Sequence, residues 1–145
     1  MTEDCVFCQI IAKKSQACIV YEDASVIAFM TNRPVNEGHT LIVPKKHHKD
    51  IYDLPEEEIA YLSRVVKRVA VAVRDSMGAE GIRVVQNNGL AAGQVIFHYH
   101  VHVIPMKPDE GFIHGKAYRS HTKGRMPEAL ALDAEKIRQK LLEGA

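Results

Sequence analysis

The run His-Tyr-His-Val-His at residues 98–102 constrains the fold of this chain more than any other feature. Three histidines alternate strictly with Tyr99 and Val101. Successive side chains of a β-strand point to opposite faces of a sheet, so a strand here would gather all three imidazoles on one face. Apolar residues flank the run, and Pro105 is expected to end the strand. The residues therefore predict a strand over 95–104 that carries a functional site.

The pattern alone leaves open the chemistry of this histidine row. Imidazole titrates near neutral pH and serves as base, acid, nucleophile or metal ligand. A single histidine on an apolar face is more often a packing residue, whereas three in alternation favour a site. A metal-dependent hydrolase or a dioxygenase-type barrel also collects ligands from a His-x-His strand, so metal catalysis stays an alternative.

Charge and composition narrow the class of partner. The 145 residues include 19 Lys plus Arg and 18 Asp plus Glu, which gives a formal net charge of +1. This net charge is too small to attract nucleic acid or an anionic membrane electrostatically, so a small ligand is expected. The acidic start Met-Thr-Glu-Asp is unlike a signal peptide, and three cysteines suit a reducing compartment. We expect a soluble, cytoplasmic protein with one domain over residues 1–145.

The order of predicted elements indicates an α+β fold. Strands are expected over 19–22, 26–31, 39–44 and 82–86, in addition to the histidine strand, and a short helix over 5–13. The clearest helix spans 54–77, with Asp53 as N-cap and Gly78 as its end. One stripe of this helix should face the core, because its apolar residues step by three and four. These residues are Ile59, Leu62, Val66, Val69 and Val73.

The pattern loosens after the histidine strand. Residues 107–126 carry glycines and charges and read as a mobile segment, in which His114 and His121 are expected to be exposed. Pro127 can open a last helix. Its apolar residues Leu130, Ile137 and Leu141 would dock on the body or on a partner chain.

The Cys-x-x-Cys pair, Cys5 and Cys8, has three interpretations. A thioredoxin-like redox motif would follow a strand, and no strand is predicted before this pair, so redox chemistry is the weaker interpretation. Two thiolates at this spacing can hold one Zn²⁺ if histidines elsewhere complete the set, and His47 and His48 are candidates. Two inert thiols are the third possibility. Cys18 is expected to be an apolar filler.

The loop over residues 87–94 lies directly before the histidine strand. Gly89 and Gly93 would let backbone N–H groups point inward and form a concavity for an anion. This signal is weak on its own, because most such loops are ordinary connections.

Together these residues resemble the histidine triad (HIT) family of nucleotide hydrolases and transferases, in its small branch with an N-terminal Cys-x-x-Cys. The family motif His-x-His-x-His stands at 98–102 and is followed by apolar residues. The resemblance covers residues 5–106. Its motifs lie at 5–8, 20–23, 38–45, 87–89, 93–94 and 98–104.

The resemblance implies a five-stranded antiparallel sheet with a long helix and a C-terminal helix, paired in a homodimer into a ten-stranded sheet. It implies that His100 attacks the α-phosphorus of a purine nucleoside phosphoramidate or related nucleotidyl conjugate, through a nucleotidyl-histidine intermediate. His102 would reach a phosphate oxygen or the leaving group, and His39 would orient the cluster. Asn87 and the backbone around Gly93 and Gln94 would bind phosphate oxygens.

The resemblance also implies a zinc site and no organic cofactor. Its ligands would be Cys5, Cys8, His47 and His98. Four protein ligands leave no open position for water, so this zinc would be structural.

Two positions depart from the family pattern. Thr31 stands where relatives carry an acidic residue for the ribose hydroxyls, and Thr31 or Asn32 could still hydrogen-bond a hydroxyl. Val95 stands where relatives place a hydroxyl residue for the leaving group. Two alternative functions follow from the resemblance: a dinucleoside polyphosphate hydrolase, or a nucleotide-binding interaction protein with incidental turnover.

Overall fold

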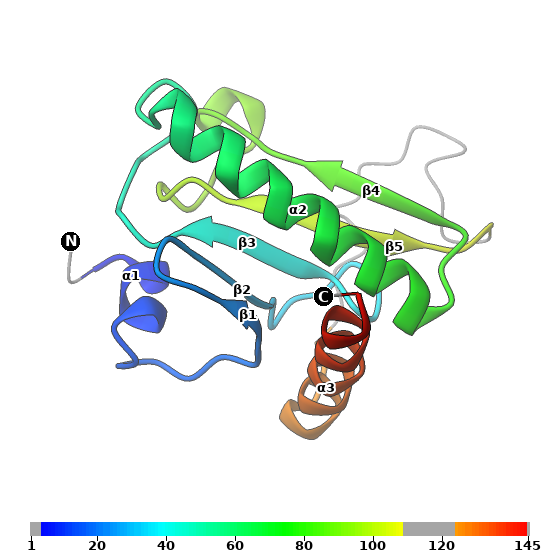
Figure 1. Cartoon of the computed structure of the whole chain (residues 1–145). Helices are drawn as coiled ribbons and strands as arrows, with labels where there is room; N and C mark the ends of the chain where they lie inside the picture. The colour runs from blue at the N-terminus through cyan, green and yellow to red at the C-terminus, as the bar shows by residue number, and fades with distance from the viewer. Residues whose placement is uncertain (1–3, 109–123, 145) are drawn as a thin grey trace.

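The computed structural model describes residues 4–108 and 124–144, and these residues form a five-stranded antiparallel sheet flanked by helices (Figure 1). The strand order is β1-β2-β3-β5-β4. The strands are β1 Ile19–Glu22, β2 Val26–Met30, β3 Thr40–Pro44, β4 Gly81–Val85 and β5 Val101–Met106. The α+β fold predicted from the sequence is confirmed.

Helices cover both faces of the sheet. The long helix α2, Glu56–Met77, lies across one face, and α3, Pro127–Glu143, packs beside it (Figure 1). The short helix α1, Val6–Ile11, packs on the other face. Alternate side chains of the strands point to the two faces of the sheet. Ala28 and Ile42 pack in the core under α2, whereas the residues on either side of them in the sequence pack in the core under α1.

The predicted stripe of α2 is confirmed in part and is wider than expected. Leu62, Val69 and Val73 are buried, and Ile59 and Val66 are partly buried against the same core. Val65 and Ala72 are buried as well. The buried face is wider because α2 packs on both the sheet and α3. Leu130 and Ile137 of α3 are buried in this core, so α3 docks on the body.

The predicted N-cap of α2 is wrong. Helix α2 begins at Glu56 with Pro55 at the N-cap position, and no side chain caps it. The Asp53 carboxylate instead accepts a hydrogen bond from the Lys49 backbone N–H at 3.0 Å. The predicted end is confirmed, because Gly78 adopts the left-handed conformation with φ +63°.

The predicted bounds of the histidine strand are also wrong. Strand β5 begins at Val101, so His98 and His100 lie before it, and it continues through Pro105. Beyond Val103, which pairs with Thr40 of β3, strand β5 pairs with β4 alone. A strand bonded on one side only tolerates a proline, because the missing N–H leaves no ladder bond unmade.

Some residues with predicted roles lie outside the described ranges. His114 and His121 lie there, as does most of the segment predicted to be mobile. Within the described residues, no helix combines the length and apolarity needed to span a bilayer.

Candidate active site and metal site

The three alternating histidines lie on one side of the sheet, as their spacing predicts. Tyr99, Val101 and Val103 belong to the core under α2. The histidine rings face the other way: Phe7 of α1 packs edge-on against His98 and His100, with centroids 5.9 and 5.1 Å apart. The alternation thus holds at residues 98–100 as well, although β5 starts only at Val101.

Four side chains from three segments form one group that could hold a metal ion. The ligand atoms of Cys5, Cys8, His47 and His98 all lie within 4.8 Å of one another. Cys8 Sγ is 3.2 Å from His47 Nδ1, and Cys5 Sγ is 3.4 Å from His98 Nδ1. A tetrahedral zinc ion with bonds of about 2.1–2.3 Å has ligand–ligand edges of about 3.6 Å. The donor set and its spacing therefore fit zinc.

The ring orientation of His98 suits a metal ligand. Its Nε2–H donates to the Pro44 carbonyl oxygen at 2.8 Å, which leaves the Nδ1 lone pair directed at the thiols. His98 is fully buried, and burial lowers its pKa to about 4. Burial also raises the pKa of the Cys5 thiol. A cation between these groups would favour the deprotonated thiols and the neutral ring.

His100 presents the opposite ring nitrogen. Its Nδ1–H donates to the His98 carbonyl oxygen at 2.8 Å, so the lone pair is on Nε2. The ring is buried, and burial lowers its pKa, which keeps it neutral at physiological pH. A neutral imidazole with its tautomer fixed is a competent nucleophile.

His39 and His102 form a second pair of rings. The Val35 backbone N–H donates to His39 Nδ1 at 3.0 Å, so the ring proton of neutral His39 is on Nε2. That proton points to His102 Nδ1, 3.0 Å away, which places the His102 ring proton on Nε2. Burial lowers the pKa of His39 to about 3 and that of His102 to about 4. The His102 and His100 ring centroids are 5.0 Å apart.

The position of His39 follows from the start of β3. Leu41 pairs directly with His102, and His39 lies two residues before Leu41 on the same face. Gly38 turns the chain into this strand with φ +98°, where an added Cβ would lie 2.5 Å from the Met77 side chain. Glycine is therefore required immediately before His39.

The predicted phosphate loop is rigidly built. The Gln94 side chain is buried; its Oε1 accepts from the Gly89 N–H at 2.8 Å, and its Nε2 donates to the Lys49 carbonyl at 2.7 Å. Gly89 and Gly93 have φ of +89° and +96°, around a short 3₁₀ helix. Since its amide holds the loop, Gln94 can offer a ligand only its backbone. Asn87 is the first residue of this loop, and its carbonyl accepts from the Gln86 side chain at 3.0 Å.

The two positions that depart from the family pattern are accessible. Thr31 Oγ1 accepts a hydrogen bond from the Arg33 N–H at 3.2 Å, and Asn32 is exposed. Val95 is 67% exposed, so its apolar side chain does not serve the core.

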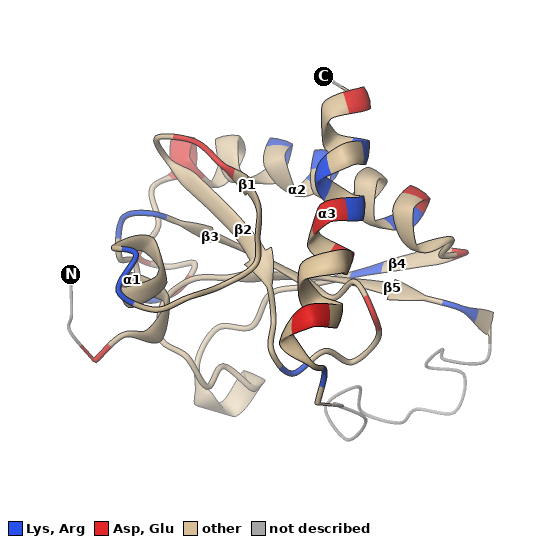
Figure 2. Ribbon diagram, turned by 90° about the horizontal axis from the view of Figure 1, so that it is seen from below, with Lys and Arg blue, Asp and Glu red and all other residues tan. Residues whose placement is uncertain are grey.

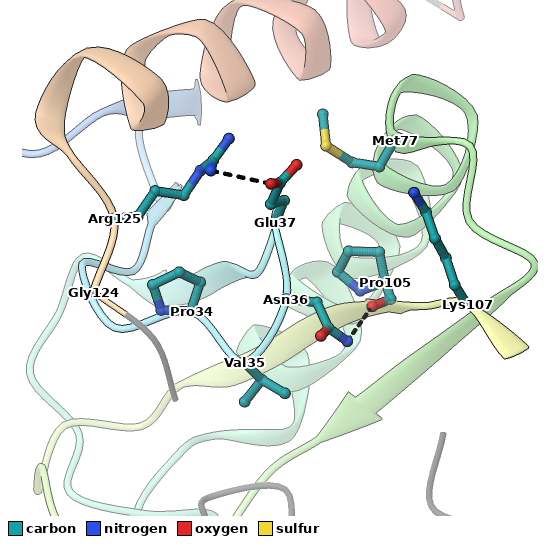
Figure 3. Close-up of a pocket in the computed structure, with 9 residues that line it drawn as sticks. All are labelled: Pro34, Val35, Asn36, Glu37, Met77, Pro105, Lys107, Gly124 and Arg125. Carbon is teal, nitrogen blue, oxygen red and sulfur yellow. Dashed lines mark hydrogen bonds and ion pairs between the residues drawn. The ribbon is translucent and has the colours of Figure 1, made fainter. Parts of the chain in front are cut away.

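A cavity of about 220 Å³ adjoins the connection between β2 and β3 (Figure 3). On its rim, Arg125 donates to both carboxylate oxygens of buried Asp133, at 2.7 and 3.0 Å, and to Glu37 at 3.2 Å. These bonds tie the β2–β3 connection to α3. The same connection carries Val35, whose N–H fixes His39.

Reasoning from the residues alone missed three contributors to the site. Phe7 packs edge-on against the rings of His98 and His100, Pro44 supplies a carbonyl to His98, and Val35 supplies the N–H to His39. Two of these act through backbone atoms and leave no signal in the sequence. The contact between the His39 and His102 rings depends on the register of β3 against β5, which the sequence does not show.

Comparison with known proteins agrees with this arrangement. Residues 12–109 match the HIT domain family. The chain belongs to the HIT family. A solved structure of a hypothetical histidine triad nucleotide-binding protein from Sulfolobus tokodaii strain7 is 37% identical, with a TM-score of 0.85 over 96% of this chain and 93% of that chain.

Two further HIT relatives bear on the site. A Zn-bound histidine triad family protein from Mycobacterium smegmatis is 32% identical, with a TM-score of 0.82 over 97% of this chain and 94% of that chain. Adenylylsulfatase HINT3 of Arabidopsis thaliana is 34% identical over 122 residues, which are 84% of this chain and 62% of that protein.

Proposed function

We propose that this HIT protein is a nucleotidyl hydrolase or transferase that cleaves purine nucleoside phosphoramidates or related nucleotidyl conjugates at the α-phosphorus. The observation that carries this proposal is the tautomer of His100, whose Nδ1–H is bonded to a backbone carbonyl while Nε2 keeps its lone pair. The relatives described as a nucleotide-binding protein and an adenylylsulfatase support the substrate class.

In the first step, His100 Nε2 attacks the α-phosphorus and the bond to the leaving group breaks. His102 Nε2–H, which the hydrogen bond from His39 places there, donates a hydrogen bond to the leaving nitrogen, and this nitrogen departs as an amine with a proton from solvent. The ring of His100 becomes cationic while it carries the nucleotidyl group. Its Nδ1–H stays bonded to the His98 carbonyl, which stabilises that charge.

In the second step, water attacks the nucleotidyl-histidine and releases a nucleoside monophosphate. The proton of this water passes to solvent, and His100 returns to its neutral state when its bond to phosphorus breaks. Backbone N–H groups near Gly93 and Gln94, together with Asn87, would hold the phosphate oxygens. Thr31 or Asn32 would meet the ribose hydroxyls.

We propose that the group Cys5, Cys8, His47 and His98 holds one zinc ion with a structural role. When bound, zinc would cross-link α1 to the segments that follow β3 and precede β5. The Zn-bound Mycobacterium relative supports this choice of metal. Four protein ligands complete a tetrahedron, so the reaction is assigned to His100 and not to the metal.

We also propose that the protein is a homodimer, joined through β4. This strand is at the edge of the sheet, and its Val84 is 53% exposed. Pairing two such edges would extend the sheet to ten strands. Light scattering should give twice the chain mass for the wild type, and Val84→Glu should shift the mass toward that of one chain.

The experiment that tests the substrate class compares adenosine phosphoramidate with a diadenosine polyphosphate under the same conditions. We expect faster turnover of the phosphoramidate, because His102 Nε2–H is placed to hydrogen-bond an amine leaving group. A clear preference for the dinucleotide would contradict this assignment. Tight nucleotide binding with negligible turnover of both compounds would favour the alternative of a nucleotide-binding interaction protein.

A further inference from the structure

A groove of about 1020 Å³ lies between α2 and the C-terminal half of α3. Figure 1 shows the C-terminal part of α3 next to α2, and both helices pack on the side of the sheet away from α1. The floor of the groove is apolar and includes Val20, Ala72 and Leu141, while Val71 and Leu142 on its walls are 40% and 70% exposed. An exposed apolar strip between two helices is a common form of binding site for a third helix.

The rim of the groove is basic. Five cationic side chains line it: Arg64, Lys67, Arg68, Arg138 and Lys140. Figure 2 shows blue segments on α2 and on α3 in this region.

Two acidic side chains share the lining: Asp75 pairs with Arg74, and Glu143 pairs with Lys140 of the rim. Arg138 of the rim pairs with Glu135. Among the ion pairs of the described residues, none involves Arg64, Lys67 or Arg68. The whole chain has a net charge of only +1, so this row of cations is a local concentration and not a general property of the surface.

The combination of an apolar floor and a basic rim selects one kind of partner. Nucleic acid would need cations on a polar surface and would gain little from a floor of Val20 and Leu141. A bilayer is flat and cannot enter a groove between two helices. We propose that the groove binds an acidic amphipathic helix of a partner protein, with its apolar face on the floor and its carboxylates on the rim.

The dimensions agree with such a ligand. The lining residues of α2 run from Arg64 to Asp75, a rise of roughly 16 Å, which matches three turns of a helix of about 11 residues. Arg64, Arg68 and Val71 recur at helical spacing along one side of α2 and form a continuous wall.

The groove is separate from the catalytic histidines. Helices α2 and α3 cover one face of the sheet, whereas His98 and His100 contact α1 on the other face. A partner bound in the groove would therefore localise the protein without blocking the histidine site.

The test uses a fluorescein-labelled peptide of about 12 residues, with leucine at i, i+3, i+4 and i+7 and glutamate elsewhere. Fluorescence anisotropy with the full chain at low ionic strength should show saturable binding. The double variant Arg64→Glu/Arg68→Glu should bind at least about tenfold more weakly, since two favourable charge pairs become repulsive. Both residues are exposed, so the variant should fold and keep the turnover of the wild type.

Two controls distinguish this groove from general charge attraction. Lys14→Glu changes an exposed cation just beyond α1 and should leave peptide affinity unchanged. A peptide with serine in place of leucine keeps every charge and should bind at least about tenfold more weakly. Equal affinity for the two peptides, or equal affinity of the wild type and the double variant, would overturn the proposal. A change in oligomeric mass on Arg64→Glu/Arg68→Glu would also overturn it, because the groove would then join copies of this chain.

Discussion

His98 and His100 are two residues apart and both are buried, yet they present different ring nitrogens. The Nε2–H of His98 donates a hydrogen bond to the Pro44 carbonyl, so Nδ1 of His98 faces the sulfur atoms of Cys5 and Cys8. In His100 the Nδ1–H donates a hydrogen bond to the His98 carbonyl, so Nε2 carries the lone pair. Two backbone carbonyl oxygens, each bonded to a different ring nitrogen, thus distinguish a candidate ligand from a candidate nucleophile of the same chemical type.

The largest effect is expected from removing the nucleophile. His100→Ala should lower the turnover of adenosine phosphoramidate by at least about a thousandfold, because no other lone pair replaces Nε2. Nucleotide affinity, measured by isothermal titration calorimetry, should stay close to that of the wild type. The matched variant His98→Ala should instead lose metal and thermal stability. If the His100→Ala protein is active, the result contradicts the assignment of the nucleophile and favours the alternative of catalysis by a metal.

The second effect concerns the metal group. Native mass spectrometry should find one zinc per chain in protein purified without chelator, and Cys8→Ser should empty the site. The free energy of unfolding should fall by about 2–4 kcal/mol, since metal binding contributes to folding. Activity should stay measurable at low temperature. Cys18→Ser is the control, because this half-buried thiol lies outside the metal group, and it should keep the zinc. A wild-type protein without zinc would leave the Cys-x-x-Cys pair unexplained.

The third effect is a pH dependence of stability. Burial lowers the pKa of His39 from 6.5 to about 3, so the folded state resists a proton that the unfolded chain accepts. The contribution of His39 to stability is therefore complete above pH 6.5 and declines as the pH falls toward the folded pKa. The expected slope is about 1.4 kcal/mol per pH unit for each such group. Urea unfolding at several pH values should give a shallower slope for His39→Gln than for the wild type, and equal slopes would refute this account.

The smallest effect is expected at the ribose position. Thr31→Asp would supply the charge that Thr31 lacks, and a charged acceptor strengthens a hydrogen bond by about 1 kcal/mol. The KM for the nucleoside substrate should fall by about fivefold. Thr31→Asn has a similar size without the charge and should change KM little. An unchanged KM in Thr31→Asp would place the ribose elsewhere.

The alternation of the histidines, and most element bounds to within two residues, were accessible from the sequence because they depend on local periodicity. Strand β1 and the end of α2 at Gly78 agree with the prediction. The start of β5 was not accessible, because it depends on Pro44 at the end of β3. Proline has no N–H for the ladder, and the Tyr99 N–H donates to the His48 carbonyl instead.

The predicted N-cap of α2 was wrong because it too depends on contacts that the local sequence pattern does not show. Asp53 satisfies the rule for a capping residue, but its carboxylate bonds to Lys49, and Pro55 occupies the cap position. In the candidate site, spacing indicated the histidine row, whereas the pairing of His39 with His102 depends on strand register. Resemblance to a family supplied His39 where periodicity could not.

The most direct test of the central claim is to trap the covalent intermediate. Enzyme mixed with excess substrate is quenched in neutral denaturant, because a phosphohistidine bond is labile in acid, and its intact mass is measured. We predict one nucleotidyl adduct per chain, which peptide mapping places on His100. An adduct on any other histidine would contradict the assignment of His100 as the nucleophile.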